Sequence, residues 1–88
     1  MGPVLADDVM CHEEEGEAFL LHVGTGRYFG LNPAGLTVWK ALAEGGDPVS
    51  ALHRRWPSIP EDRCRADYES LLAALVEAGL ARLPGDRP

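Results

Sequence analysis

Two residue pairs, Asn32-Pro33 and Asp47-Pro48, predict where the first two helices of this chain begin. Asparagine and aspartate side chains accept hydrogen bonds from the free N–H groups of a first helical turn, and proline suits the first helical position because its missing N–H would have no partner there. Apolar residues then recur at helical spacing, at Leu36, Val38, Trp39 and Leu42 after the first pair and at Val49, Leu52 and Trp56 after the second. The sequence therefore predicts two helices, the first stopped by Gly45-Gly46 and the second by residues 57–60.

A third helix is predicted over about residues 60–78. Its apolar residues lie on one helical stripe, at Tyr68, Leu71, Leu72, Leu75 and Val76. Gly79 ends this helix, because glycine readily adopts the left-handed conformation that closes helices. Residues 80–83 are predicted to form a short extended tail and residues 84–88 a disordered end.

The segment before Asn32 has the pattern of short strands. Residues 18–23 are an apolar run between turn residues, and residues 27–31 form the next strand after the glycine-rich connection 24–26. Residues 9–11 form a weaker strand that Val4 and Leu5 could extend, and the charged segment 12–17 is predicted to be a turn. The order predicts an α+β fold that is winged helix-turn-helix-like, with an N-terminal three-stranded antiparallel sheet followed by three helices.

Length and charge restrict the class of protein. A chain of 88 residues makes one small domain, expected here to span residues 1–88 with an ordered part of about 8–83. Its 14 acidic and 8 basic residues give a net charge of −6, which opposes general binding to nucleic acid or anionic membranes. No apolar run approaches the roughly 20 residues of a membrane span, and the start lacks a signal-peptide pattern, so we expect a cytoplasmic protein.

No group of residues has the spacing of a catalytic or metal site. Cys11 and His12 are sequence neighbours on a strand, so they point to opposite faces and cannot form a thiolate–imidazole pair. Cys64 could be activated by the start of the third helix, but a reduced, partly buried thiol is the simpler interpretation. The three histidines lie in separate elements, and the run Glu13-Glu14-Glu15 lacks the spacing of a calcium loop. We expect no catalytic residue, no metal and no cofactor.

A DNA-binding regulator is the alternative that the helix-turn-helix pattern raises. Arg54 and Arg55 close the second helix in a small basic cluster. A recognition helix would need cations along the third helix as well, but that helix carries five acidic residues against Arg63 and Arg65. The charge pattern therefore ranks DNA binding second.

One aromatic residue of the last predicted strand must face away from the core. Consecutive strand residues face opposite sides of a sheet, so of the neighbours Tyr28 and Phe29 one faces outward. Their strand is the last of the predicted sheet, so it leaves a row of unpaired N–H and C=O groups, and neither lysine nor proline blunts it. Two interpretations follow. Either the edge accepts an extended peptide as an added strand, or another part of the chain covers it.

The segment TGRYFGLNPAGLTVWKALAEG, residues 25–45, resembles the PqqD-like family. The family pattern is a strand with Thr/Asp-Gly-x-Tyr/Phe-x-x-Leu-Asn followed by a helix with Gly and Trp, and it maps onto Thr25, Gly26, Tyr28, Leu31, Asn32, Gly35 and Trp39. A later part of the family pattern is a helix that ends in an apolar pair, followed by Leu and then by Gly-Leu. It maps onto Leu71, Leu72, Leu75, Gly79 and Leu80. The resemblance covers about residues 8–83.

The resemblance implies a non-catalytic recognition element for the leader segment of a ribosomally synthesised precursor peptide. The leader would add to the third strand and lie against the third helix. The peptide-binding residues expected on this basis are Arg27, Tyr28, Phe29, Gly30 and Leu31 on the strand and Cys64, Asp67, Tyr68, Leu71 and Leu75 on the helix. Some of these helix positions must serve the core instead, and the sequence alone does not separate the two sets.

Within the family, a free-standing chain of this length most resembles lasso-peptide leader-binding proteins. Such proteins work beside a leader peptidase and a cyclase, whereas other members serve radical enzymes or cyclodehydratases. The acidic residues of the third helix either match basic residues of a leader or form a solvated face. The sequence leaves both interpretations open.

Overall fold

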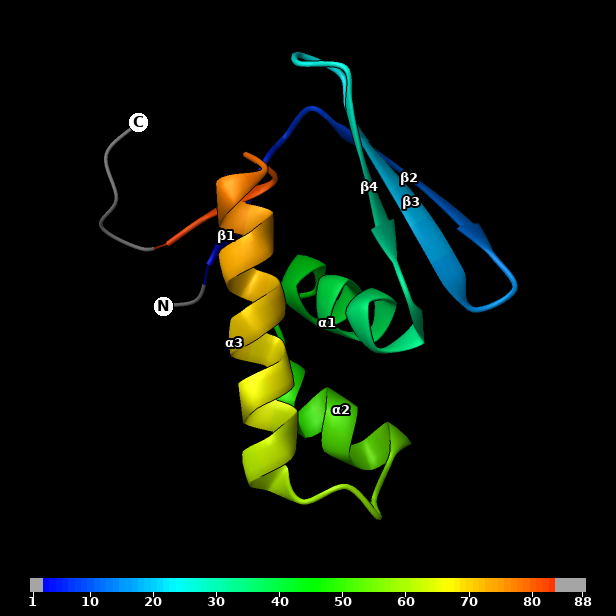
Figure 1. Ribbon diagram of the computed structural model, residues 1–88, viewed down its shortest axis with the longest axis vertical. Coiled ribbons are helices and arrows are strands. Elements are labelled where there is room, and N and C mark those ends of the chain that lie inside the picture. Colours follow the sequence, from blue (N-terminus) through cyan, green and yellow to red (C-terminus); the bar gives the residue numbers. More distant parts are fainter. Residues whose placement is uncertain (1–2, 84–88) are drawn as a thin grey trace.

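The computed structural model of the protein describes residues 3–83 of the 88 in the chain. The elements follow in the order β1 (Val4–Leu5), β2 (Val9–Glu14), β3 (Glu17–His22), β4 (Arg27–Leu31), α1 (Pro33–Ala43), α2 (Pro48–Arg55), α3 (Glu61–Glu77) and β5 (Ala81–Arg82). Three antiparallel strands precede three helices, so the predicted α+β class is confirmed (Figure 1). The predicted disordered end, residues 84–88, lies outside the described residues.

The sheet has the strand order β2-β3-β4, and both junctions are antiparallel. One prediction was wrong here: segment 12–17 is not a turn, because β2 continues to Glu14 and β3 starts at Glu17. The turn is confined to Glu15 and Gly16, whose φ angles of 52° and 83° are both positive, as in the tight turns that match strand twist. Charged residues can sit in β2 because that strand is exposed along nearly all of its length.

A second, two-stranded sheet joins the two ends of the described chain. Val4 and Leu5 do not extend β2, as the sequence suggested; they form β1, which pairs antiparallel with β5. The predicted extended tail is therefore a strand, and the N–H of Ala6 adds a 2.9 Å hydrogen bond to the carbonyl of Leu80. Leu80, only 1% exposed, holds this tail against the core.

The two predicted helix starts are confirmed. The side chain of Asn32 accepts a hydrogen bond from the N–H of Gly35 at the start of α1, and that of Asp47 accepts one from the N–H of Val49 at the start of α2. Gly79, with a φ of 79°, follows the end of α3 as expected. The two helix starts and the end of α3 could be predicted from the sequence because each depends on the chemistry of neighbouring residues.

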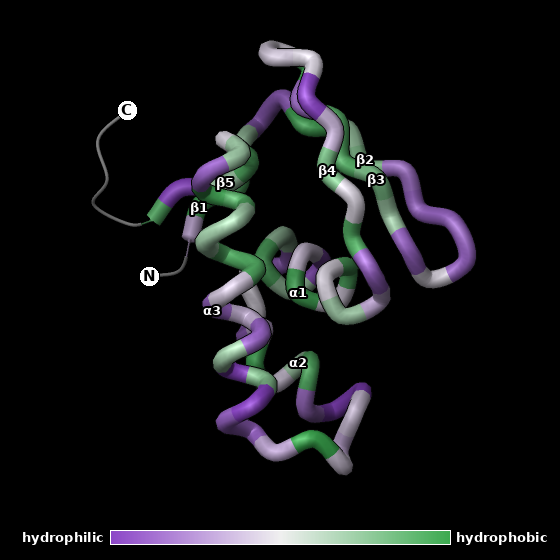
Figure 2. Tube along the Cα trace, viewed as in Figure 1, coloured by the Kyte–Doolittle hydropathy of each residue, from purple (hydrophilic) through white to green (hydrophobic). Residues whose placement is uncertain are grey.

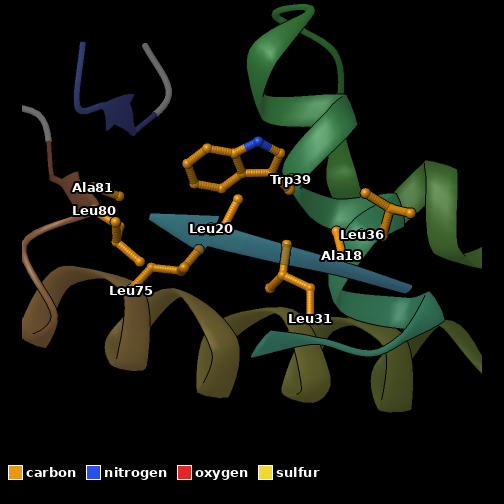
Figure 3. Packing of buried hydrophobic residues seen from close by; sticks show 8 residues of the cluster. All are labelled: Ala18, Leu20, Leu31, Leu36, Trp39, Leu75, Leu80 and Ala81. Atoms are coloured by element: carbon orange, nitrogen blue, oxygen red, sulfur yellow. The ribbon is translucent and has the colours of Figure 1, made fainter. Parts of the chain in front are cut away.

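The core consists of two adjoining clusters. In the larger one, Trp39 of α1 lies over Leu20 of β3, while Leu31 of β4 and Leu75 of α3 point toward the same centre (Figure 3). The smaller cluster joins α1 and α2 to the first half of α3 through Val38, Val49, Leu52 and Cys64. Leu71 of α3 packs against both clusters, so α3 connects the sheet end of the molecule to α2.

Hydrophilic residues gather at the β2–β3 turn and along the first half of α3 (Figure 2). Within residues 3–83, none of the helices has the length and apolar character needed to cross a bilayer.

Candidate functional site

The candidate site begins at the outer edge of β4. This strand pairs with β3 on one side, and no other strand in the described part of the chain pairs with its opposite side. In Figure 1, β4 is the strand of the sheet that lies nearest to α3. Its outer backbone N–H and C=O groups are therefore open to an added strand on the side that faces the helix.

Side chains of β4 alternate between the two faces of the sheet. Leu31 is buried in the core and Phe29 packs partly against it, whereas Tyr28 points away with 74% of its surface exposed. The predicted division of the two aromatic neighbours is thus observed: Phe29 faces the core and Tyr28 faces outward. A peptide added to this edge would alternate in the same way.

The junction between β4 and α1 is tightly packed. Asn32 follows the last residue of β4, and its Oδ1 accepts a 2.8 Å hydrogen bond from the N–H of Gly35. A Cβ at Gly35 would lie 3.1 Å from Cδ2 of Leu31, so a side chain there would require Leu31 to shift, and glycine permits the close approach of α1 to the strand. The end of the open edge is therefore held in place by a helix cap and a close contact.

Beside this junction, the structure contains a groove of about 430 Å³ between the start of α1 and the middle of α3. Its floor and walls are mostly small or apolar. The lining residues are Asn32, Ala34, Gly35, Val38, Leu52, Asp67, Ser70, Leu71 and Ala74. None of these lining residues belongs to β4 itself, but Asn32 directly follows Leu31, so the groove begins where β4 ends.

The residues predicted on the third helix fall into two groups. Asp67 and Leu71 line the groove. Cys64 and Leu75 are 3% and 0% exposed and belong to the core, and Tyr68 is half-buried against the smaller cluster. The structure therefore assigns Cys64 and Leu75 to packing and leaves Asp67 and Leu71 facing the groove.

Several groove residues were not singled out from the sequence. On α3, Ser70 and Ala74 lie three and seven positions after Asp67, which places them on the same side of the helix. A row of small residues at this spacing is the signal that could have identified the helical wall. The contributions of Ala34 and Leu52 depend on how α1 and α2 cross, which no local pattern encodes.

Among the residues that line the groove, Asp67 carries the charge. Asp67 has a half-exposed carboxylate that lies 3.7 Å from the guanidinium of Arg63, one turn earlier on α3. Near the base of the helix, burial raises the pKa of Tyr68, and the nearby carboxylates of Asp47 and Glu69 raise it further. The phenol therefore stays neutral at physiological pH, and the fixed charge within the groove itself comes from Asp67.

The thiols are not placed for chemistry. Cys11 is exposed on β2, where partial burial and the Glu13 carboxylate raise the pKa of its thiol against a smaller opposing effect of Lys40. Cys64 is enclosed by the smaller core cluster. Across residues 3–83, no three histidine, cysteine, aspartate or glutamate side chains come together as a metal site would require.

The basic cluster near the end of α2 lies away from the β4 edge. Arg55 stacks over the ring of Trp56 at 5.1 Å, and both Arg54 and Arg55 line a pocket that also contains Glu44 and Asp47. On α3, the cation of Arg65 lies 3.4 Å from the carboxylate of Glu61. On α3, Arg63 also lies 3.7 Å from the carboxylate of Asp67. Both α3 cations are thus beside carboxylates, so in the described part of the chain α3 lacks the continuous positive face that a recognition helix presents to DNA.

Comparison with known proteins gives two matches and one negative result. Residues 17–81 match the family model described as coenzyme PQQ synthesis protein D (PqqD). The structure of TbiB1 in complex with the TbiA(beta) leader peptide superimposes with a TM-score of 0.81 at 31% sequence identity, over 97% of this chain and 99% of that one. No curated protein matches significantly.

Both matches include β3, β4, the groove and α3. Proteins of this family are non-catalytic, so the expectation that the chain is not an enzyme is confirmed by its relatives. The family model covers most of the chain, and a relative above 30% identity spans nearly all of it. This chain belongs to the PqqD family.

Proposed function

We propose that this chain binds the leader segment of a ribosomally synthesised precursor peptide. The leader adds as an extended strand to the outer edge of β4 and runs along the groove beside α3. The observation that carries this proposal is the position of an open strand edge next to a groove with a largely apolar lining. Main-chain hydrogen bonds would supply a general affinity for extended peptides, and the groove would select their side chains.

The relative supports the same type of ligand. TbiB1 shares 31% identity with this chain over almost its whole length, and its structure contains a leader peptide. At this level of similarity the two chains share more than a fold, so a leader is the first ligand to test.

The charges on the two sheet edges favour β4 over β2. The outer strand β2 carries Glu13 and Glu14, charged residues of the kind that discourage strand addition. By contrast, β4 has Arg27 as its only charged residue, at the end of the strand farther from α1. An extended peptide therefore meets less opposition at β4, and only there does it lie next to the groove.

Apolar leader side chains that enter the groove would provide much of the selectivity. Each fully buried aliphatic or aromatic side chain contributes on the order of 1.5–3 kcal/mol. Ala34, Leu71 and Ala74 offer apolar surface in the groove, and Asp67 adds a negative charge at its wall. The preferred leader segment thus combines apolar side chains with a neighbouring basic residue.

The pathway we propose is lasso-peptide biosynthesis. In that role the chain would deliver the bound leader to a separate leader peptidase and work beside a cyclase. The proposal rests on the resemblance of residues 8–83 to the PqqD-like family, in which this chain most resembles lasso-peptide leader-binding proteins. Reconstitution with the precursor, peptidase and cyclase encoded beside this chain would test it, and a neighbouring radical enzyme or cyclodehydratase in their place would contradict it.

Calorimetric titration tests the binding proposal. The probe is the synthetic leader of the precursor peptide encoded beside this chain, and a scrambled version of that leader is the control. We expect a roughly one-to-one complex with the leader and none with the scrambled peptide. Absence of binding to the native leader would overturn the proposal.

Two proline variants test the mode of binding. Consecutive N–H groups of a strand point to opposite sides, so of Phe29 and Gly30 one donates toward β3 and the other toward the open edge. Phe29→Pro and Gly30→Pro should therefore differ: one loses leader affinity with a small change in Tm, and the other loses stability as well. If both variants fold and keep wild-type affinity, the leader does not pair with β4.

A mobility-shift assay addresses the DNA-binding alternative. We expect no shift of duplex DNA at physiological salt, because the chain has a net charge of −6 and its α3 cations lie beside carboxylates. Salt-sensitive DNA binding that disappears in an Arg54→Ala/Arg55→Ala variant would reverse the ranking of the two functions.

A further inference from the structure

The face of the sheet that points away from α1 carries exposed apolar side chains. Phe19 of β3 is 55% exposed, Tyr28 of β4 is 74% exposed, and Met10 of β2 is 63% exposed. The register places Met10, Leu21 and Tyr28 in one cross-strand row and pairs Phe19 with Gly30 in the next. Neither the core nor the groove uses these side chains, so the fold by itself does not explain them.

Gly30 is also unexplained by the fold. Its φ is not among the positive glycine values, so its backbone does not require glycine. A Cβ added there would make only ordinary contact with the Phe19 ring, at 3.8 Å, so packing does not require glycine either. Glycine inside a strand weakens that strand and often marks the close approach of a ligand.

Phe19 and Gly30 together form a shallow apolar platform that reaches the open edge. The Phe19 ring atoms Cε1 and Cδ1 lie 3.8 and 4.0 Å from the position of a Cβ on Gly30, so the ring leans over the strand that has no side chain at this point. Tyr28, two residues before Gly30, stands on the same face of β4. The platform is therefore adjacent to any strand that pairs with β4.

We propose that Phe19, Gly30 and Tyr28 form a second leader-binding subsite on the outer face of the sheet. This inference rests on the proposed function, because it requires the leader to add to β4. Side chains of an added strand alternate between the faces, so the residue next to one that enters the groove points toward the platform. The missing side chain at Gly30 leaves room for that residue to lie across the strand and contact the Phe19 ring.

The chemistry of the platform selects an apolar or aromatic leader residue. Phe19 and Tyr28 present ring surfaces, and aromatic rings favour offset or edge-to-face contact with other rings and with aliphatic groups. The leader motif is therefore expected to have apolar residues at two neighbouring positions. One is held on the α3 side and the other on the outer face.

Two alanine variants test this subsite with the native leader as probe. Phe19→Ala should weaken leader binding roughly five- to tenfold, which is the scale of one lost aromatic contact. Met10→Ala is the matched control, because Met10 is exposed on the same face but lies two strand spacings, about 10 Å, from β4. We expect that control to bind the leader like the wild type, and equal weakening by both variants would overturn the inference.

Coupling to the peptide identifies the contact itself. An alanine scan of the leader should contain one position at which substitution removes most of the Phe19→Ala effect, and the adjacent position should couple instead to Ser70→Leu in the groove. Gly30→Ala provides a second variant: its Cβ fits the fold, so Tm should hold or rise while leader affinity falls.

The outcomes separate the two proposals. If the wild-type protein does not bind the leader, the proposed function is refuted. Normal leader binding in Phe19→Ala and Gly30→Ala refutes the subsite alone. If the Phe19→Ala and Met10→Ala variants both bind leader normally but the peptidase no longer cleaves the bound precursor, the outer face serves another protein and the inference is wrong. Concentration-dependent dimers that Phe19→Ala abolishes, with unchanged leader affinity, would equally assign this face to a second copy.

Discussion

The side-chain oxygen of Asn32 accepts a 2.8 Å hydrogen bond from the N–H of Gly35, and this bond connects the end of β4 to the first turn of α1. Gly35 in turn lies against Leu31, the last residue of β4. The open strand edge and one wall of the groove are thereby fixed relative to each other. A peptide that binds both surfaces meets a site whose geometry exists before binding.

Gly35→Ala tests this connection. Its Cβ would lie 3.1 Å from Cδ2 of Leu31 and 3.3 Å from Oδ1 of Asn32, and Leu31 is buried, so the neighbours cannot easily move. We expect the free energy of unfolding to fall by about 1–3 kcal/mol in denaturant titration. Gly46→Ala is the matched control, because its nearest contact would be an ordinary 3.6 Å. Equal stability of both variants would show that the junction tolerates a side chain.

Ser70→Leu should block the groove without unfolding the protein. Ser70 is exposed on α3 and lines the groove, and leucine favours helices more than serine does. If the leader loses one buried apolar side chain, its affinity should fall roughly tenfold to a hundredfold in calorimetry. Ala73→Leu places the same side chain on α3 outside the groove and should bind normally. A Ser70→Leu variant with wild-type affinity would remove the groove from the binding site.

Asp67→Lys should change charge selectivity. The Asp67 carboxylate is half exposed at the groove wall, so reversing it should weaken a leader with a nearby cation and leave a neutral analogue almost unaffected. We expect roughly a three- to tenfold effect at low salt, which declines as salt screens the charges. Glu69→Lys makes the same change in net charge on α3 outside the groove. Equal effects of the two variants would mean that only overall charge matters.

Asp47 makes part of the stability depend on pH. A hydrogen bond from the Ser50 hydroxyl is the main cause that lowers the pKa of Asp47, and the N–H of Val49 also bonds to its carboxylate. Because the folded-state pKa lies below the unfolded value of about 3.9, this stabilisation is complete above that value and is lost as pH falls through the folded-state pKa. Asp47→Asn keeps a capping side chain but cannot titrate. The difference in Tm between wild type and Asp47→Asn should therefore shrink as the pH falls from about 5 to about 2, the range set by these pKa values. Thermal melts at several pH values measure it, and a difference that stays constant would contradict the assignment.

Local chemistry explains what the sequence predicted well. The caps at Asn32 and Asp47 and the left-handed glycine at Gly79 each act within one helical turn, so the residues themselves mark the helix boundaries. Strand alternation predicted that one of Tyr28 and Phe29 faces outward, and the structure shows that this residue is Tyr28. Family resemblance added what no local pattern contains, a functional class for the open edge.

Long-range pairing explains what the sequence did not predict. Val4 and Leu5 pair with a tail almost 80 residues later in the chain, and two-residue strands have too little pattern to recognise. The charged half of β2 was mistaken for a turn because its exposed faces carry no apolar alternation. Cys64 and Asp67 both lie on α3, yet only the crossing of α2 shows that the first is enclosed and the second faces the groove.

Mapping amide chemical shifts while the native leader is added tests the central claim most directly. We predict the largest changes at Arg27–Leu31 and at Asp67, Ser70 and Leu71, with outer β4 amides becoming protected from hydrogen exchange. The residues His53, Arg54, Arg55 and Trp56 should change little. If the largest changes map to that basic cluster and Arg27–Leu31 stays unaffected, the leader does not add to β4 and the account is wrong.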